Sequence, residues 1–258
     1  MADDVFESCL AEVITNLRSY IGPQFSFKDE QVISIHQLFS GKDLIAVLPT
    51  GFGKSLIFQA LVLLKERQHG RKGCILVITP LNSIIKDQIL EVSSLGITAC
   101  SLVEHIDNLE DLLSGKYSIV YASAECATDK RFLSHLKKDS FFKSNLLACV
   151  VDETHTVETW TGLRGKNQKS KMTKGEALRA AYGELAILRS FFNEGTPVAA
   201  LTGTADASTI SKVKQLLVLK NPLEVRISPN RANIRISVMK AKKEHIMKNL
   251  DWLVKTVK

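Results

Sequence analysis

The chain has 258 residues, 45% of them hydrophobic, and a formal net charge of +7, so it can bury a sizeable core in one large domain or two small ones. No apolar run reaches the roughly 18 residues of a membrane span. The acids Asp3, Asp4 and Glu7 stand where a signal peptide would carry basic residues. The sequence therefore predicts neither a membrane-spanning segment nor a secretory signal.

The five cysteines are scattered singly, without a Cys-x-x-Cys pair or a Cys/His cluster. Several lie inside apolar runs, where cysteine is a small core residue. Zinc sites need clustered ligands, so no zinc is expected. An odd number of dispersed cysteines is typical of a reducing compartment.

The positive charge is concentrated in residues 161–175, which carry five basic residues and no acid. Positive charge of this kind indicates a polyanionic partner. Arg164 and Lys166 are the candidates for nucleic-acid contact in this segment. The alternative, a solvated loop without a partner, fits the sequence equally well.

Apolar residues recur at helical or strand spacing along most of the chain. In chain order, the spacing predicts helices at 5–20, 29–40, 54–67, 81–95, 108–114, 130–138, 176–193 and 207–217. It predicts strands at 43–48, 73–79, 97–103, 117–122, 146–151, 197–202 and 223–227. This alternation predicts an α/β fold, a doubly wound and mostly parallel sheet flanked by helices. Ligands of such sheets bind at the carboxyl ends of the strands, where Gly51, Asp152 and Thr202 would converge.

The pattern divides the chain into three segments. Residues 1–22 form an amphipathic helix that stops at Gly22-Pro23, and residues 23–228 form the nucleotide-binding domain. Residues 229–258 read as a connector, one further strand and a lysine-rich amphipathic stretch. That segment is too short to close another core, so we expect an appendage or the stub of a further domain.

Residues 48–55, LPTGFGKS, come between an apolar strand and a helix and predict a phosphate-binding loop. Gly51 and Gly53 let backbone N–H groups turn toward an anion. Lys54 would neutralise the β- and γ-phosphates, and Ser55 would offer its hydroxyl to Mg²⁺. The strict pattern has a glycine at the position of Leu48, so the loop alone is a weaker signal than the loop with its partner motif.

That partner is VVDETH at 150–155, an apolar strand that ends in two adjacent carboxylates. Asp152 can hold the metal with its water shell, and Glu153 can take a proton from an attacking water. Lys54, Asp152 and Glu153 are therefore the catalytic candidates. The two motifs together predict an enzyme that hydrolyses a nucleoside triphosphate, ATP or GTP.

Six ordered motifs resemble the first, RecA-like motor lobe of a RecQ-type superfamily 2 DNA helicase. They are FKDEQ (27–31), GKDLIAVLPTGFGKSLIFQ (41–59), VITPLNSIIKDQ (77–88), SIVYASAE (118–125), VVDETHTVETW (150–160) and ALTGTA (200–205). PNRANIRISV (229–238) is similar to the entry into the second lobe. Gln31 precedes Lys54 by 23 residues, an interval similar to that of RecQ helicases and longer than that of DEAD-box RNA helicases.

The resemblance implies an ATP-dependent 3′-to-5′ DNA helicase that acts on single-stranded or forked DNA, in DNA repair and recombination, in the nucleus. It implies that Gln31 reads the amino edge of adenine. The residues around the nucleotide would be Phe27, Lys28, Gln31, Pro49, Thr50, Gly51, Phe52, Gly53, Lys54 and Ser55, with Ser55 and Asp152 holding Mg²⁺. Those that contact DNA would be Thr79, Pro80, Asn82 and Ser123. Those that couple the nucleotide to DNA would be His155, Trp160, Thr202 and Thr204.

The chain departs from the family pattern at several places. Thr154 and Gly203 replace alanines, and we expect little loss from the first and a softer linker from the second. A basic insertion replaces the aromatic loop after Trp160, which puts DNA-stimulated turnover in doubt. A motor of this type also needs a second RecA-like lobe, which a separate chain could supply in trans. We therefore expect ATP–Mg²⁺ binding, slow hydrolysis and no unaided unwinding.

Three other hypotheses stay open. A non-enzymatic, ATP-gated module that binds DNA or protein is disfavoured by the intact Lys54, Asp152 and Glu153. An RNA helicase lobe is disfavoured by the position of Gln31. A P-loop kinase is disfavoured because Glu153 would have no water to activate.

Overall fold

The computed structural model describes residues 2–80, 82–106, 109–137, 141–155, 184–230 and 234. Its centre is a seven-stranded sheet, in the order β3-β4-β2-β5-β6-β1-β7, in which every pairing is parallel. The strands are β1 (Leu44–Val47), β2 (Cys74–Ile78), β3 (Ala99–Ser101), β4 (Ile119–Ala122), β5 (Leu146–Val151), β6 (Val198–Thr202) and β7 (Leu223–Arg226). All seven predicted strands are present, and the predicted parallel sheet is confirmed.

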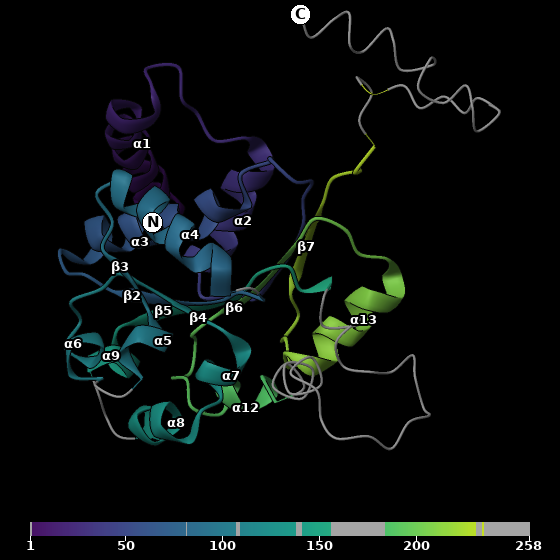
Figure 1. The fold of residues 1–258 in the computed structure, drawn as a ribbon. Helices are drawn as coiled ribbons and strands as arrows, with labels where there is room; N and C mark the ends of the chain where they lie inside the picture. Colours follow the sequence, from purple (N-terminus) through teal and green to yellow (C-terminus); the bar gives the residue numbers. More distant parts are fainter. Residues whose placement is uncertain are drawn as a thin grey trace, which may run out of the picture.

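Helices cover both faces of this sheet, as the prediction of a doubly wound fold requires (Figure 1). One face carries α1 (Ala2–Ile21), α2 (Asp29–Phe39), α3 (Lys54–His69) and α4 (Asn82–Ser94). The other carries α5 (Leu102–His105), α6 (Glu110–Leu113), α7 (Ala124–Ala127), α8 (Lys130–Lys137), α9 (Phe141–Ser144), α12 (Ala186–Arg189) and α13 (Ala207–Leu216).

The alternation of side chains along each strand creates two separate cores. On β1, Leu44 and Ala46 join the core beneath α1–α4, whereas Ile45 and Val47 join the core on the other face. Because both faces are buried, the strand is apolar at every position and shows no polar alternation. This explains why the strands read in the sequence as continuous hydrophobic runs.

The N-terminal helix α1 is longer than predicted at both ends and packs against α3. Phe6, Val13 and Leu17, which recur at helical spacing, are each at most 2% exposed. Asp3 at its start lies 3.1 Å from Nε2 of His36 on α2. The helix therefore seals the outer surface of α2 and α3.

Some predicted boundaries are wrong. The strand expected at 97–103 covers only Ala99–Ser101, because the chain turns into α5 at Leu102. Of the helix expected at 176–193, the described part is helical only over Ala186–Arg189. The single-turn helices α7 and α9 were not predicted, since four residues are too few to show helical periodicity.

Residues 156–183 lie outside the described residues, and with them Trp160, Arg164, Lys166 and the basic segment. Residues 235–258 lie outside them as well. Among the helices that the structure does describe, none has the length and apolar character needed to span a membrane.

Candidate active site

The phosphate-binding loop lies between β1 and α3. Gly51 has φ of 78° and Gly53 has φ of 90°, values in the left-handed region that favours glycine. Gly53 is the N-cap of α3, so Lys54 and Ser55 open the helix. The amino end of a helix presents free N–H groups and a partial positive charge, which suits a phosphate.

Lys54 is held between the loop and the carboxylates of the second motif. Its Nζ donates to the carbonyl oxygen of Leu48 at 3.3 Å and lies 3.8 Å from Oε1 of Glu153. The side chain is only 11% exposed, so screening by solvent is reduced. Lys54 therefore presents a sheltered positive charge beside the loop.

Residues of α2 hold the loop from outside. Gln31, which is 2% exposed, donates from Nε2 to the carbonyl oxygens of Phe52 at 3.1 Å and Gly53 at 3.0 Å. Its Oε1 accepts from the N–H of Lys28 at 2.9 Å. Lys28 Nζ donates to the Phe52 carbonyl at 3.2 Å and lies 4.0 Å from the centre of the Phe52 ring. A Cβ on Gly53 would lie 2.6 Å from Gln31 Nε2, so this contact requires glycine.

The other residues expected around the nucleotide differ in how far they are buried. Phe27 is buried and packs edge-on against Phe25, with ring centres 5.1 Å apart. Pro49 accepts a hydrogen bond from the Phe52 N–H at 3.1 Å, and Thr50 is exposed. The loop is thus closed on itself by one backbone hydrogen bond, with its tip open to solvent.

Asp152 and Glu153 follow the carboxyl end of β5. The Asp152 N–H donates to the carbonyl of Ile78 at 2.8 Å, which ties the residue to β2. Burial, followed by the charge of Glu153, raises the pKa of Asp152 to about 6. Glu153 has φ of 48°, a value rarely adopted outside glycine, and such strain is concentrated at functional sites.

A chain of polar contacts joins this motif to the end of β6. Thr202 Oγ1 donates to the carbonyl of Thr204 at 3.0 Å, so it accepts from Nδ1 of His155 at 2.9 Å. This pairing assigns a proton to His155 Nδ1, which also lies 3.2 Å from Oε2 of Glu153. Lys54, Glu153, His155, Thr202 and Thr204 therefore form one continuous network across three strand ends.

The position of Thr154 was expected to matter little, and the structure gives its hydroxyl a partner. Thr154 is 1% exposed, and both its N–H and its Oγ1 donate to the carbonyl of Leu201, at 3.0 and 3.3 Å. The threonine thus adds a second tie between β5 and β6. Only its replacement of alanine in the family pattern could have pointed to this contact.

Three of the residues expected to contact DNA are buried, although a DNA contact requires accessible atoms. Thr79, Pro80 and Ser123 are all buried, and the Thr79 N–H is occupied by the carbonyl of Ala122 at 2.9 Å. Ser123 Oγ accepts from the Cys126 N–H at 3.3 Å and so caps α7. Asn82 begins α4. These residues shape the end of the sheet beside Asp152, and their contact with DNA stays a prediction.

The donor set suits Mg²⁺ bound together with phosphates. The described residues contain no group of three or more His, Cys, Asp or Glu that could enclose a metal. Mg²⁺ is usually held by one or two carboxylates, waters and substrate phosphates rather than by an all-protein cage. Asp152, with Ser55 in the first turn of α3, offers oxygen ligands of this kind.

The fold and this arrangement define a P-loop nucleotide-binding domain. The DEAD/DEAH box helicase family matches residues 28–213, and the chain belongs to that family.

Named relatives refine this assignment to the RecQ type. The chain is 31% identical over 222 residues to "Putative ATP-dependent DNA helicase Q1" of Caenorhabditis elegans, covering 83% of this chain and 32% of that protein. It is 34% identical to "ATP-dependent DNA helicase Q-like 4B" of Arabidopsis thaliana, covering 83% and 18%. It is 31% identical to "ATP-dependent DNA helicase RecQ" of Haemophilus influenzae, covering 86% and 32%. The RecQ-type resemblance is confirmed, and the chain spans about a third or less of these relatives.

Among solved structures, the DUF1998 helicase MrfA bound to DNA and AMPPNP superposes with a TM-score of 0.61. The sequence identity is 19%, and the match covers 85% of this chain and 29% of MrfA. At this identity the likeness supports the fold alone, and it agrees with the predicted RecA-like domain.

Proposed function

We propose that this chain is the ATP-binding and ATP-hydrolysing lobe of a RecQ-type, 3′-to-5′ DNA helicase. The observation that carries the proposal is the network from Lys54 through Glu153 and His155 to Thr202. It joins the phosphate-binding loop, the paired carboxylates and Thr202 of the ALTGTA motif (200–205) in one set of contacts. A simple nucleotide-binding loop does not need such a connection.

The network gives each residue a chemical task. Lys54 would turn its ammonium from Glu153 toward the β- and γ-phosphates, while Ser55 and Asp152 hold Mg²⁺, which neutralises phosphate charge. Released from Lys54, Glu153 would accept a proton from the attacking water. To bind the adenine edge, Gln31 would exchange one of its two donated contacts, with Phe52 or Gly53, for the base, and this exchange would report base binding to the loop.

The further partners follow from the same family. The preferred nucleic acid would be single-stranded or forked DNA, contacted around Thr79 to Asn82 and at Ser123. His155 and Thr202 would transmit its presence to Glu153. A second motor lobe would act in cis or in trans, and a nuclear location would place the protein with its substrate.

The proposal is tested by ATP hydrolysis with and without single-stranded DNA, in the wild type, Lys54→Ala and Glu153→Gln. We expect Lys54→Ala to lose ATP binding, because its charge faces the phosphates. We expect Glu153→Gln to bind ATP normally but to lose turnover by roughly two to four orders of magnitude, the usual contribution of a general base.

ATP binding by the wild type that Lys54→Ala abolishes, without turnover in any form, would instead assign an ATP-gated binding module. Preference for RNA over DNA in the same assay would assign the lobe to an RNA helicase.

A further inference from the structure

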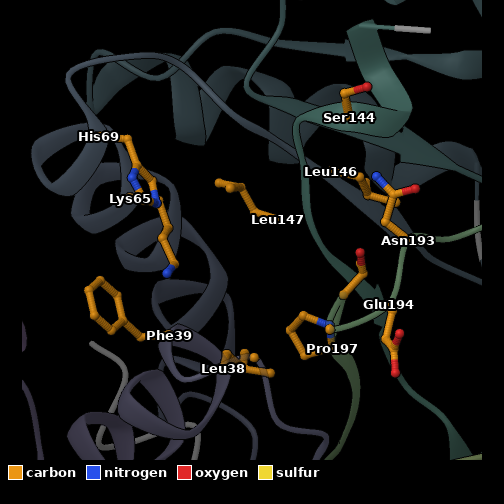
Figure 2. A pocket seen from close by; sticks show the side chains of 13 residues that line it. Leu38, Phe39, Lys65, His69, Ser144, Leu146, Leu147, Asn193, Glu194 and Pro197 are labelled. Carbon is orange, nitrogen blue, oxygen red and sulfur yellow. The ribbon is translucent and has the colours of Figure 1, made fainter. Parts of the chain in front are cut away.

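A pocket lies at the amino ends of the strands, at the end of the sheet opposite the phosphate-binding loop. It has a volume of about 310 Å³ and is enclosed by the ends of α2 and α3 and by the segments that lead into β5 and β6 (Figure 2). Lys54 begins α3 and His69 ends it. Lys65, which lines the pocket, follows Lys54 by 11 residues of this helix, about 17 Å at 1.5 Å per residue. The pocket is therefore separate from the nucleotide site.

The exposed lining of the pocket is more polar than apolar, and one wall is cationic. The half-buried Leu147 supplies apolar surface beside the buried Leu38 and Pro197. Lys65 and His69 line the wall formed by α3 (Figure 2). The opposite wall is polar and is formed by Ser144, Asn193, Glu194 and Thr196. Pockets for small molecules combine an apolar surface with a few polar groups in this way.

The charge of Lys65 has no carboxylate partner among the described residues. Its Nζ donates to Oε1 of Gln68 at 2.9 Å and lies 4.0 Å from the centre of the Phe39 ring. Glu194 across the pocket forms no ion pair with Lys65 or His69. The half-buried ammonium is thus held by a neutral acceptor and an aromatic face, which leaves it able to take an anion.

The surroundings of Lys65 add to this positive charge. Burial lowers the pKa of Lys65, since the charged form is poorly solvated. Partial burial, then the charges of Lys65 and Arg71, lower the pKa of His69. The His69 shift thus includes repulsion by neighbouring positive charges, which an anion in the pocket would offset.

We propose that this pocket binds a small amphipathic anion, a phosphate or carboxylate carried on a compact apolar frame. Lys65 would bind the anionic group, with His69 beside it. The frame would lie against Leu147. An inorganic anion lacks the frame, and a neutral aromatic molecule lacks the charge, so neither uses the whole pocket.

The test uses phenyl phosphate as the probe, with phenol and inorganic phosphate as its two halves. The full chain carries Lys54→Ala, so that the phosphate-binding loop cannot account for binding, and affinities are measured by calorimetry. We expect phenyl phosphate to bind more tightly than either half. In this background a failure of the pocket does not affect the proposed ATP site.

Lys65→Met keeps the aliphatic stem over Phe39 and removes the charge. We expect it to weaken phenyl phosphate binding roughly tenfold to a hundredfold, the value of a charge-assisted hydrogen bond. Lys72→Met, the same change at an exposed site on the same segment, should alter affinity less than about twofold. His69→Gln is the second variant, with an expected loss of several-fold, and it decides the matter if Lys65→Met does not fold. Absence of saturable binding, or equal losses in Lys65→Met and Lys72→Met, would overturn the proposal.

Discussion

The carboxyl group of Asp152 is buried, so its ionised form, which would bind Mg²⁺, lowers the stability of the folded protein. The pKa of Asp152 is raised to about 6, whereas the pKa of an aspartate in an unfolded chain is about 3.9. Between these values the folded protein binds a proton that the unfolded chain does not bind, so stability rises as the pH falls through this window. Above about pH 6 the ionised group lowers the free energy of unfolding until a cation neutralises it.

We therefore expect Asp152→Asn to raise the melting temperature of the nucleotide-free protein at about pH 7.5. The advantage should shrink toward about pH 5, where the wild-type group is largely protonated. Asn keeps the oxygen that accepts from the Glu153 N–H. Thermal unfolding at both pH values measures the difference, and equal melting temperatures at pH 7.5 would contradict it. Asp111→Asn is the control, because the exposed Lys116 lowers the pKa of Asp111.

Asp43 lies in the motif at 41–59, but its role in joining distant segments of the fold is visible only in the structure. Its carboxylate accepts from Arg189 Nη1 at 2.9 Å, the Val198 N–H at 2.8 Å and the Lys220 N–H at 2.7 Å. It is 3% exposed, so removing it strands a largely buried guanidinium. We expect Asp43→Ala to lower the free energy of unfolding by about 3–5 kcal/mol, as measured by urea denaturation.

The matched control for Asp43 is Asp111→Ala, which breaks an exposed pair with Lys116 at 2.8 Å. Because solvent screens an exposed pair, we expect this variant to lose much less stability than Asp43→Ala. Similar losses in the two variants would show that burial does not set the strength of the Asp43 contacts.

At the scale of elements, α1 contributes to stability through a single buried face. Leu17 is 1% exposed, and we expect Leu17→Ala to lower the free energy of unfolding by about 2–5 kcal/mol through lost burial and a residual cavity. Leu90 on α4 is 70% exposed, so Leu90→Ala should change the free energy of unfolding by less than about 0.5 kcal/mol. Urea denaturation of both variants gives the comparison, and a tolerated Leu17→Ala would mean that α1 is loosely attached.

The sequence predicted the central strands well because they are buried on both faces, whereas β7 at the edge of the sheet is largely exposed. A run such as LLACVV at 146–151 has no other stable place than the centre of such a sheet. Some boundaries were predicted less well. The strand β3 gives way to α5 at Leu102, and α12 ends at Arg189, and neither change is marked by a proline or glycine in the sequence. Single-turn helices carry too few residues for a periodic signal.

The chemical types in the site were predictable, but the directions of its contacts were not. The family resemblance implied that Gln31 belongs to the nucleotide site, yet only the structure shows both ends of its amide in contact with backbone. Likewise, Thr79 was expected at a DNA surface and is fully buried. A motif gives the identity of a residue, whereas the side-chain orientation depends on neighbours far away in the sequence.

For the whole molecule, the parallel sheet separates two kinds of site. The carboxyl ends of β1, β5 and β6 gather the phosphate-binding loop, the carboxylates and Thr202, where helix amino ends favour anions. The amino ends carry Asp43 and the cationic pocket. Because α3 runs between the two edges, it is the element through which occupation of the pocket could alter the loop.

The rate of ATP hydrolysis by this lobe alone depends on the charges around the γ-phosphate. In related phosphoryl transfer, an arginine brought against the γ-phosphate contributes roughly 10³–10⁵ in rate. Lys54 lies 3.8 Å from Glu153, whereas Arg189 is engaged with Asp43 at the amino ends of the strands. We therefore expect slow ATP turnover by the 258-residue chain and no strand displacement. Adding the second lobe of a RecQ-type helicase in trans should raise turnover, as measured by phosphate release. Robust unwinding of a forked duplex by this chain alone would show that it supplies the missing charge itself.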